Sequence, residues 1–310
     1  MPSQRVLVSG VSWFDLQFQG RPNRIACGLV TGAAGTAIVD PGPTSCLETL
    51  EASLALHGQS LAAVTHLVLT HIHLDHAGAT GTILRRHPRI RVVVHERGAR
   101  HLVDPSKLLE SATRLYGSAM DTLWGEVAPV PERNLDVIQG GESIEAGGRS
   151  FDVAYTPGHA SHHVSFFDRS SGIAFVGDTA GVCVHGGYVL PPTPPPDIDV
   201  ELWLQSIQTI DRWRPSTLFL THFGPVTSAV PAHLQALADN LQRSAALVRE
   251  SLATEGTDAD RKAHYETRMR AELRAQMSEE LATAYETAAG FRMSWPGLAR
   301  YWRKKEAVPK

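Results

Sequence analysis

The chain is poor in cysteine, with 3 among its 310 residues: Cys27, Cys46 and Cys183. Thiols this few and this scattered do not form the disulfide framework of a small secreted protein. The first ten residues hold one arginine and are followed by no long apolar stretch, so we expect no secretory signal. Together these absences favour a reducing compartment, the cytoplasm.

Long hydrophobic runs and an excess of positive charge are also missing. The sequence has no run of about 18 apolar residues, so we expect no membrane-spanning helix and no membrane partner. The formal net charge is −3, and no stripe of Lys and Arg is present, so we expect no nucleic-acid partner. With 43% hydrophobic and 20% charged residues, the composition is that of a folded globular protein.

Histidine, in contrast, occurs 15 times. It is the usual ligand for borderline metals and the usual acid–base group near neutral pH. Scattered histidines would be surface or core residues, whereas clustered ones would indicate a site. Their positions therefore decide between these interpretations.

The order of elements predicts an α/β (α+β) fold. Short β-rich runs and helical segments share the first 225 or so residues, and the remainder is helical by its periodicity. We expect a catalytic domain over 1–228, with a helical insertion at about 97–131, and a helical C-terminal extension over 229–310. The strand-like runs are 5–8, 36–39, 65–70, 90–95, 151–155, 164–168, 173–176 and 218–220. The helical runs are 46–57, 80–86, 232–252 and 258–289, and Asp199 could cap a further helix that has Trp203, Ile207 and Ile210 on one face.

A cluster of metal-ligand residues follows the strand predicted at 65–70. It reads His71-x-His73-x-Asp75-His76. In an extended or turning backbone, residues two apart project the same way, so His71 and His73 can converge on one cation. Asp75 and His76 can face a second one. Imidazole nitrogens with a carboxylate oxygen suit Zn²⁺, Fe or Mn rather than Ca²⁺ or Mg²⁺.

Three further polar residues recur in matching places downstream. His159, Asp178 and His222 each follow a predicted strand or the turn after it. Strand ends are where a sheet scaffold presents functional groups. Taken singly, each of these residues is a weak signal, because a lone strand-end histidine is more often a surface residue.

These motifs make the chain resemble the metallo-β-lactamase-fold hydrolases, in particular their glyoxalase II and lactonase-like branch. The resemblance covers about Val6 to Pro225 and includes Asp40 in Val39-Asp40-Pro41-Gly42, ahead of the cluster at 71–76. It implies an αββα sandwich of two mixed β-sheets flanked by helices, with the site at one edge.

The resemblance also implies a ligand set for two divalent ions, most simply Zn²⁺ with Fe or Mn as alternatives. The first ion would be held by His71, His73 and His159; the second by Asp75, His76 and His222; and Asp178 would bridge both. Asp40 would orient the ligands without binding metal. Asp75 could also accept a proton from the bridging water, as a catalytic residue.

Two more histidines lie close to this set. Where many relatives have a serine after the residue equivalent to His159, this chain has Ala160-Ser161-His162-His163. His162 and His163 could orient the ligands or contact substrate; alternatively, His163 is a core residue and His162 is solvated. Strand alternation predicts that only one of the two faces the metals.

The ligand set predicts a hydrolase in which a metal-bridging hydroxide is the nucleophile. The resemblance to glyoxalase II and lactonase-like relatives implies that the bond cleaved is a carboxylic ester, thioester or lactone of a small molecule. A phosphodiesterase or nuclease of the same fold stays open, as does a metal-binding scaffold without catalysis. Tyr116, Trp124, Tyr188 and Phe223 are aromatic candidates for substrate contact, although each could equally be core. An apolar residue occurs at every fourth position from Tyr265 to Tyr285. This stripe could pack on its own domain or join two copies in a homodimer.

Overall fold

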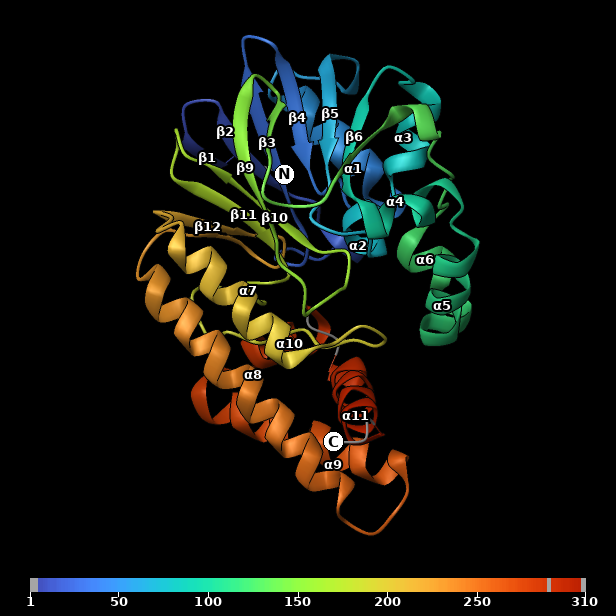
Figure 1. Cartoon of the computed structure of the whole chain (residues 1–310), viewed down its shortest axis with the longest axis vertical. Helices are drawn as coiled ribbons and strands as arrows, with labels where there is room; N and C mark the ends of the chain where they lie inside the picture. Colours follow the sequence, from blue (N-terminus) through green and yellow to red (C-terminus); the bar gives the residue numbers. More distant parts are fainter. Residues whose placement is uncertain (1–4, 289–290, 308–310) are drawn as a thin grey trace.

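Two β-sheets pack face to face, and helices cover the outer face of each (Figure 1). The computed structural model describes residues 5–288 and 291–307. The expected αββα sandwich with additional C-terminal helices is therefore confirmed. No helix among the described residues is long and apolar enough to cross a membrane.

The first sheet has seven strands in chain order. The pairs from β1–β2 to β3–β4 are antiparallel, whereas the pairs from β4–β5 to β6–β7 are parallel. The bounds are β1 (Arg5–Val8), β2 (Val11–Asp15), β3 (Ala26–Gly32), β4 (Gly35–Val39), β5 (Val64–Val68), β6 (Arg91–His95) and β7 (Leu135–Ile138).

The second sheet has six strands in the order β13-β12-β11-β10-β9-β8. Only β11 and β12 are parallel, with Phe175 opposite Phe219. The bounds are β8 (Ser143–Ala146), β9 (Arg149–Tyr155), β10 (Val164–Asp168), β11 (Ile173–Gly177), β12 (Thr217–Leu220) and β13 (Gly224–Val226).

The helices fall into three groups along the chain. The first covers the seven-stranded sheet, the second lies in the expected insertion, and the third covers the six-stranded sheet. The bounds are α1 (Leu47–Leu56), α2 (Leu74–Ala77), α3 (Thr80–Arg86), α4 (Glu96–Val103), α5 (Ser106–Tyr116), α6 (Met120–Trp124), α7 (Val200–Arg212), α8 (Val230–Leu252), α9 (Asp258–Gln276), α10 (Glu279–Ala288) and α11 (Phe291–Ala307). Short 3₁₀ turns occur at Phe18–Gly20, Thr44–Cys46, Leu61–Ala63, Gly117–Ala119 and Glu132–Asn134.

Three apolar layers hold the sandwich together. The middle layer joins the sheets through residues such as Trp13 and Phe175. One outer layer packs Leu50 of α1 and Ile83 of α3 on the first sheet. The other packs Trp203 of α7 on the second sheet. The central strands of each sheet are thus buried on both faces, which explains why they read as short apolar runs.

The C-terminal helices share the outer layer of the second sheet. Side chains from α8, α9, α10 and α11 join those of α7, β11 and β12 in one apolar cluster. No gap in packing therefore coincides with the boundary expected at 228/229, and the division into two domains stays a prediction.

The apolar repeat from Tyr265 to Tyr285 packs within its own chain. Tyr265, Met269, Leu273 and Tyr285 are buried in that cluster, and Met277 and Leu281 are partly buried against it. The stripe therefore packs on its own domain, as one of the two alternatives had it, and gives no support to a homodimer. The helix predicted over 258–289 is wrong in one respect. It is broken at Met277, and the Oγ of Ser278 accepts a hydrogen bond from the backbone N–H of Leu281 at 3.3 Å.

The cap expected at the start of α7 is present. The backbone N–H of Leu202 donates to Oδ1 of Asp199 at 3.0 Å. Such a cap satisfies one of the free N–H groups of the first turn.

The variant Asp199→Ala is expected to lose about 1 kcal/mol of unfolding free energy, because that N–H loses its partner. Urea denaturation followed by circular dichroism measures the change. The exposed Asp211 on the same helix gives the control Asp211→Ala, expected to stay within about 0.5 kcal/mol of the parent. Equal stability of all three proteins would contradict the assigned cap.

Candidate metal centre

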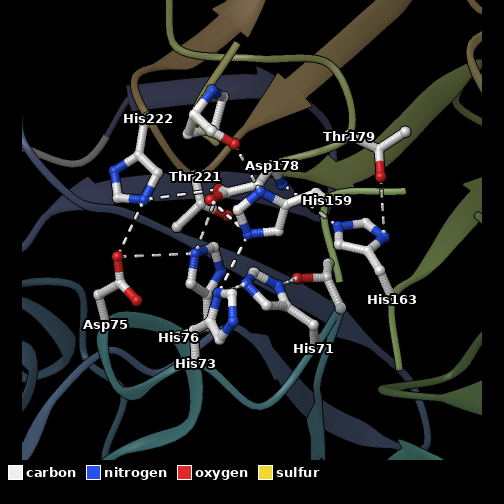
Figure 2. A network of polar contacts seen from close by, with 12 residues as sticks. His71, His73, Asp75, His76, His159, His163, Asp178, Thr179, Thr221 and His222 are labelled. Atoms are coloured by element: carbon white, nitrogen blue, oxygen red, sulfur yellow. Dashed lines mark hydrogen bonds and ion pairs between the residues drawn. The ribbon is translucent and has the colours of Figure 1, made fainter. Parts of the chain in front are cut away.

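The predicted ligands all lie at one edge of the sandwich, just beyond strand ends. His71 and His73 follow β5, and Asp75 and His76 lie in the short helix α2. The remaining three come from the second sheet or the turns beside it: His159 after β9, Asp178 after β11 and His222 after β12. Figure 2 shows their side chains pointing toward one another.

One group of three imidazoles converges on a point. Nε2 of His71 lies 2.9 Å from Nδ1 of His73, and Nε2 of His159 lies 3.0 Å from that same atom. Nitrogens around a tetrahedral zinc ion at about 2.0–2.1 Å would be about 3.3 Å apart. Two of the three distances are a few tenths of an ångström shorter than this, and all three ligand atoms lie within 4.8 Å of one another, so the group can converge on one metal ion.

A second group lies beside the first. Oδ2 of Asp75 lies 3.2 Å from Nε2 of His222 and 3.9 Å from Nε2 of His76. These ligand atoms, like those of the first group, lie within 4.8 Å of one another. They offer one carboxylate oxygen and two imidazole nitrogens.

The carboxylate of Asp178 lies between the two groups. Its Oδ2 lies 3.3 Å from Nε2 of His159, on the side of the first group. Its Oδ1 lies 3.2 Å from Nε2 of His76 and 3.5 Å from Nε2 of His222, on the side of the second. One side chain therefore faces both groups, as the bridging role requires.

Hydrogen bonds at the far ring nitrogens set the tautomers. Nδ1 of His159 lies 2.9 Å from the Pro192 carbonyl oxygen, and Nδ1 of His222 lies 2.6 Å from that of Arg24. Because a carbonyl only accepts, we infer that each Nδ1 carries the hydrogen and each Nε2 keeps its lone pair for a cation. His71 is held similarly, with Nδ1 at 3.1 Å from the Thr70 hydroxyl.

Asp40 lies beneath the second group and binds four donors. Its carboxylate accepts from Nδ1 of His76 at 2.7 Å, from the backbone N–H of Thr70 at 2.9 Å and from that residue's hydroxyl at 2.7 Å. The Thr221 hydroxyl donates to it at 2.9 Å. Asp40 itself is 1% exposed, so it contacts ligands without reaching the cavity. It is therefore placed to orient His76, and its orienting role stays a prediction.

The two threonines were not predicted as site residues. Each directly precedes a predicted ligand, in Thr70-His71 and in Thr221-His222. That repeated dipeptide at two strand ends is the signal that could have identified them.

The charge states suit metal binding. Burial and the neighbouring imidazoles lower the pKa of His71 well below its ordinary value, and burial with His159 lowers the pKa of His73 to about 4. Burial alone would raise the pKa of Asp178, but His222, His76 and His159 outweigh it and hold that pKa well below its usual range. Burial would lower the pKa of His76 and of His222 as well, but Asp178 and the other nearby carboxylates outweigh it and raise both. A cation at the second group would therefore displace protons from these two imidazoles, whereas His71 and His73 offer neutral nitrogens.

Two buried atoms of the site also lack a hydrogen bond within the described residues. These are Nε2 of His76 and Oδ1 of Asp178, which lie 3.2 Å apart as a charge pair but form no hydrogen bond. An unsatisfied buried polar atom costs about 1–3 kcal/mol, and coordination of a cation would satisfy both. The residues present therefore fit two divalent ions.

His162 and His163 both border the ligands. They precede β10 rather than lying on it, so strand alternation does not apply to them. His162 is only 9% exposed, not solvated, and lines the cavity. His163 lies behind the ligands, where its Nε2 accepts from the backbone N–H of Asp178 at 3.3 Å.

A cavity of 1560 Å³ opens at the ligand groups. Its wall combines the strand-end residues with α4 to α6, the proline-rich segment 192–197 and the C-terminal helices. Small-molecule sites usually measure about 300–1,000 Å³, so this one admits a substrate of ordinary metabolite size or larger.

Two of the four aromatic candidates line this cavity. Tyr116 and Trp124 do so, with their rings edge to face at 5.1 Å. Tyr188 and Phe223 are not among the lining residues, which corrects the expectation for them. The Tyr188 hydroxyl donates to Glu272 at 3.3 Å, and Phe223 packs edge to face on Trp13 between the sheets.

Comparison with known proteins gives a consistent result. A family model described as the metallo-beta-lactamase superfamily matches residues 20–222. A metallo-beta-lactamase fold-containing protein of Sulfurisphaera tokodaii is 30% identical over 173 residues, which are 55% of this chain and 64% of that protein. A hydroxyacylglutathione hydrolase of a Synechococcus strain is 31% identical over 152 residues, or 48% of this chain and 46% of that protein. The matches thus span less than two thirds of either relative.

Solved structures resemble the whole chain in fold. A metallo-beta-lactamase family protein from Thermus thermophilus superposes with a TM-score of 0.74 at 22% identity, covering 98% of this chain and 96% of that one. A beta-lactamase domain protein from Burkholderia ambifaria gives 0.64 at 18% identity, covering 99% and 90%. At these identities the likeness extends to the fold, including the C-terminal helices.

The variant Asp40→Asn is expected to weaken metal binding about 10- to 100-fold, because the amide cannot accept from all four donors that now hold His76 and the threonines. Competition with a chromogenic chelator measures the affinity. Asn tolerates the left-handed backbone of Asp40 (φ 51°), so the loss reports the carboxylate rather than the turn. The exposed Asp211→Asn serves as the control. Unchanged affinity in Asp40→Asn would remove its orienting role.

Proposed function

This chain belongs to the metallo-beta-lactamase superfamily, and from that premise we propose that it is a two-metal hydrolase of small molecules carrying a carboxylic ester, thioester or lactone. The observation that carries the proposal is the Asp178 carboxylate, with one oxygen on each of two ligand groups. A site for a single ion would need no such side chain.

The proposed ligands are those that the sequence predicts. His71, His73 and His159 would hold one ion, and Asp75, His76 and His222 the other. The ions proposed are Zn²⁺, Fe or Mn, because imidazole and carboxylate donors suit all three. When bound, two such ions lower the pKa of a shared water and polarise the oxygen of the scissile bond.

Asp75 is the residue proposed to handle a proton. Burial would raise its pKa, but His76 and His222 outweigh burial and hold that pKa at about 2, so the carboxylate is ionised. It also lines the cavity, where a substrate would lie. A carboxylate in that position can accept a proton from an attacking water.

The bond type is proposed from two observations. Relatives of similar sequence are named hydroxyacylglutathione hydrolases, whose name denotes cleavage of an acyl group from glutathione. The cavity has room for a small molecule, and residues of both ligand groups are part of its lining. Phosphodiester cleavage remains the alternative that the experiment must separate.

Elemental analysis with a hydrolysis panel tests this proposal. We expect two metal equivalents per chain and turnover of lactones, thioesters or p-nitrophenyl esters. The panel also contains phosphodiesters and a β-lactam. Phosphodiester turnover alone would overturn the proposed bond type, and full metal without any turnover would favour a scaffold.

The variant Asp75→Ala tests the second ion and the proton transfer together. Its metal content is expected to fall toward one equivalent and its turnover at least about 100-fold, because the carboxylate serves both. Asp197→Asn is the matched control, since it removes another carboxylate from the cavity wall but none from the ligand groups. Two retained equivalents and full turnover in Asp75→Ala would exclude the two-metal mechanism.

A further inference from the structure

The wall of the cavity is rich in positive charge. Apart from Asp75 and Asp178, it carries three acidic side chains, Glu96, Asp197 and Glu286. Against these stand seven basic ones: Arg21, Arg24, Arg97, Arg100, Lys107, Arg270 and Arg292. The net charge of the whole chain is −3, so this concentration is local to the site.

Arg24 differs from the other basic residues of the wall. It is only 8% exposed, and it forms no ion pair with any residue that the structure describes. Arg270 on the same wall is paired twice, with Glu266 at 3.2 Å and with Glu286 at 2.9 Å. A guanidinium that is buried without a carboxylate is rare, because desolvation of its charge is not compensated.

The hydrogen bonds of Arg24 are incomplete as well. Its Nη1 donates to the carbonyl oxygen of Ala284 in α10. Its Nε is buried without a partner, and its Nη2 makes no hydrogen bond to a described residue. Nε and Nη2 form the side of a guanidinium that binds a carboxylate or phosphate through two parallel bonds.

A second arginine increases the local positive potential. Burial and then the nearby charge of Arg21 lower the pKa of Arg24, and the carboxylate of Asp15 opposes them only in part. Arg21 lines the same cavity. Two like charges at one wall repel each other, and an anion between or beside them would relieve that repulsion.

The backbone of Arg24 also contacts one of the proposed metal ligands. Its backbone carbonyl accepts from Nδ1 of His222 at 2.6 Å, while its side chain lines the cavity. An anion held by the guanidinium would therefore lie in the same cavity as the ligands of the second group.

From this geometry we propose that Arg24 anchors an anionic group of the substrate, a carboxylate or a phosphate, while the scissile bond lies at the metal groups. The proposal rests on the proposed hydrolase and narrows its substrates to esters, thioesters or lactones that carry a negative charge away from the reacting bond. Arg21 adds to the attraction at the same wall.

Binding of dicarboxylates to the metal-loaded enzyme tests the anchor without turnover. Calorimetry would compare succinate, glutarate and adipate with their monoamides, which keep one carboxylate for the metals and lose the other. We expect at least one dicarboxylate to bind about tenfold or more tightly than its monoamide. The corresponding phosphono acids show whether the anchor prefers a phosphate-like group.

Arg24→Met is expected to abolish that preference, and Arg24→Lys to restore part of it. Neither substitution removes the backbone carbonyl that holds His222, so metal content should stay at two equivalents. The exposed Arg268 lies outside the cavity, and Arg268→Met is the control that should behave as the parent. Equal weakening of dicarboxylate and monoamide in Arg24→Met would mean that Arg24 only holds α10 in place.

The parent protein alone can also decide the matter if Arg24→Met does not fold. A parent that binds every dicarboxylate and its monoamide equally would overturn the anchor. Failure of the hydrolysis panel together with a preference that depends on Arg24 would overturn the proposed function but leave the anion site standing. The experiments therefore distinguish a failure of the proposed hydrolase from a failure of the proposed anion anchor.

Discussion

The carboxylate of Asp40 is the contact on which the edge of the sandwich depends. It follows β4 in one sheet and accepts from Thr221, which follows β12 in the other. It also accepts from Thr70 and from His76, so four donors from three segments meet on two oxygens. A buried carboxylate is stable only when it is satisfied in this way. The same bonds that join the sheets therefore set the positions of the neighbouring ligands.

Much of the site could be predicted from sequence because its chemistry is concentrated at strand ends. The residues from His71 to His76 are close in sequence, and the buried strand before them can be recognised from its apolar residues. The hydrogen-bond partners of the ligands cannot be recognised in this way, because they come from distant segments. Arg24 and His222 lie 198 positions apart, and no local pattern links a backbone carbonyl to a histidine that far away. Ligand types were therefore predictable, and the resemblance to the family also implied Asp40, whereas the backbone carbonyls that bind His159 and His222 were not predictable.

The fold shows the same division between local and distant information. The cap at Asp199 was predictable because it depends on residues three apart. The break at Met277 was not expected, since the apolar repeat continues through it while Ser278 caps a new helix. Being aromatic likewise did not show whether a residue lines the cavity or lies in the core. Trp124 reaches the cavity from the helical insertion, whereas Phe223 is enclosed between the sheets.

Two kinds of segment form the cavity: the ends of strands, and helices outside the sheets. The strand ends supply the two ligand groups, while α4 to α6 and the C-terminal helices supply most of the remaining wall. These wall segments lie outside the strand pairing that positions the ligands. Insertions, deletions and substitutions in them can therefore accumulate during divergence without shifting the register of either sheet. A lineage built on this scaffold can therefore reshape the wall of its cavity while the residues at the strand ends keep their positions.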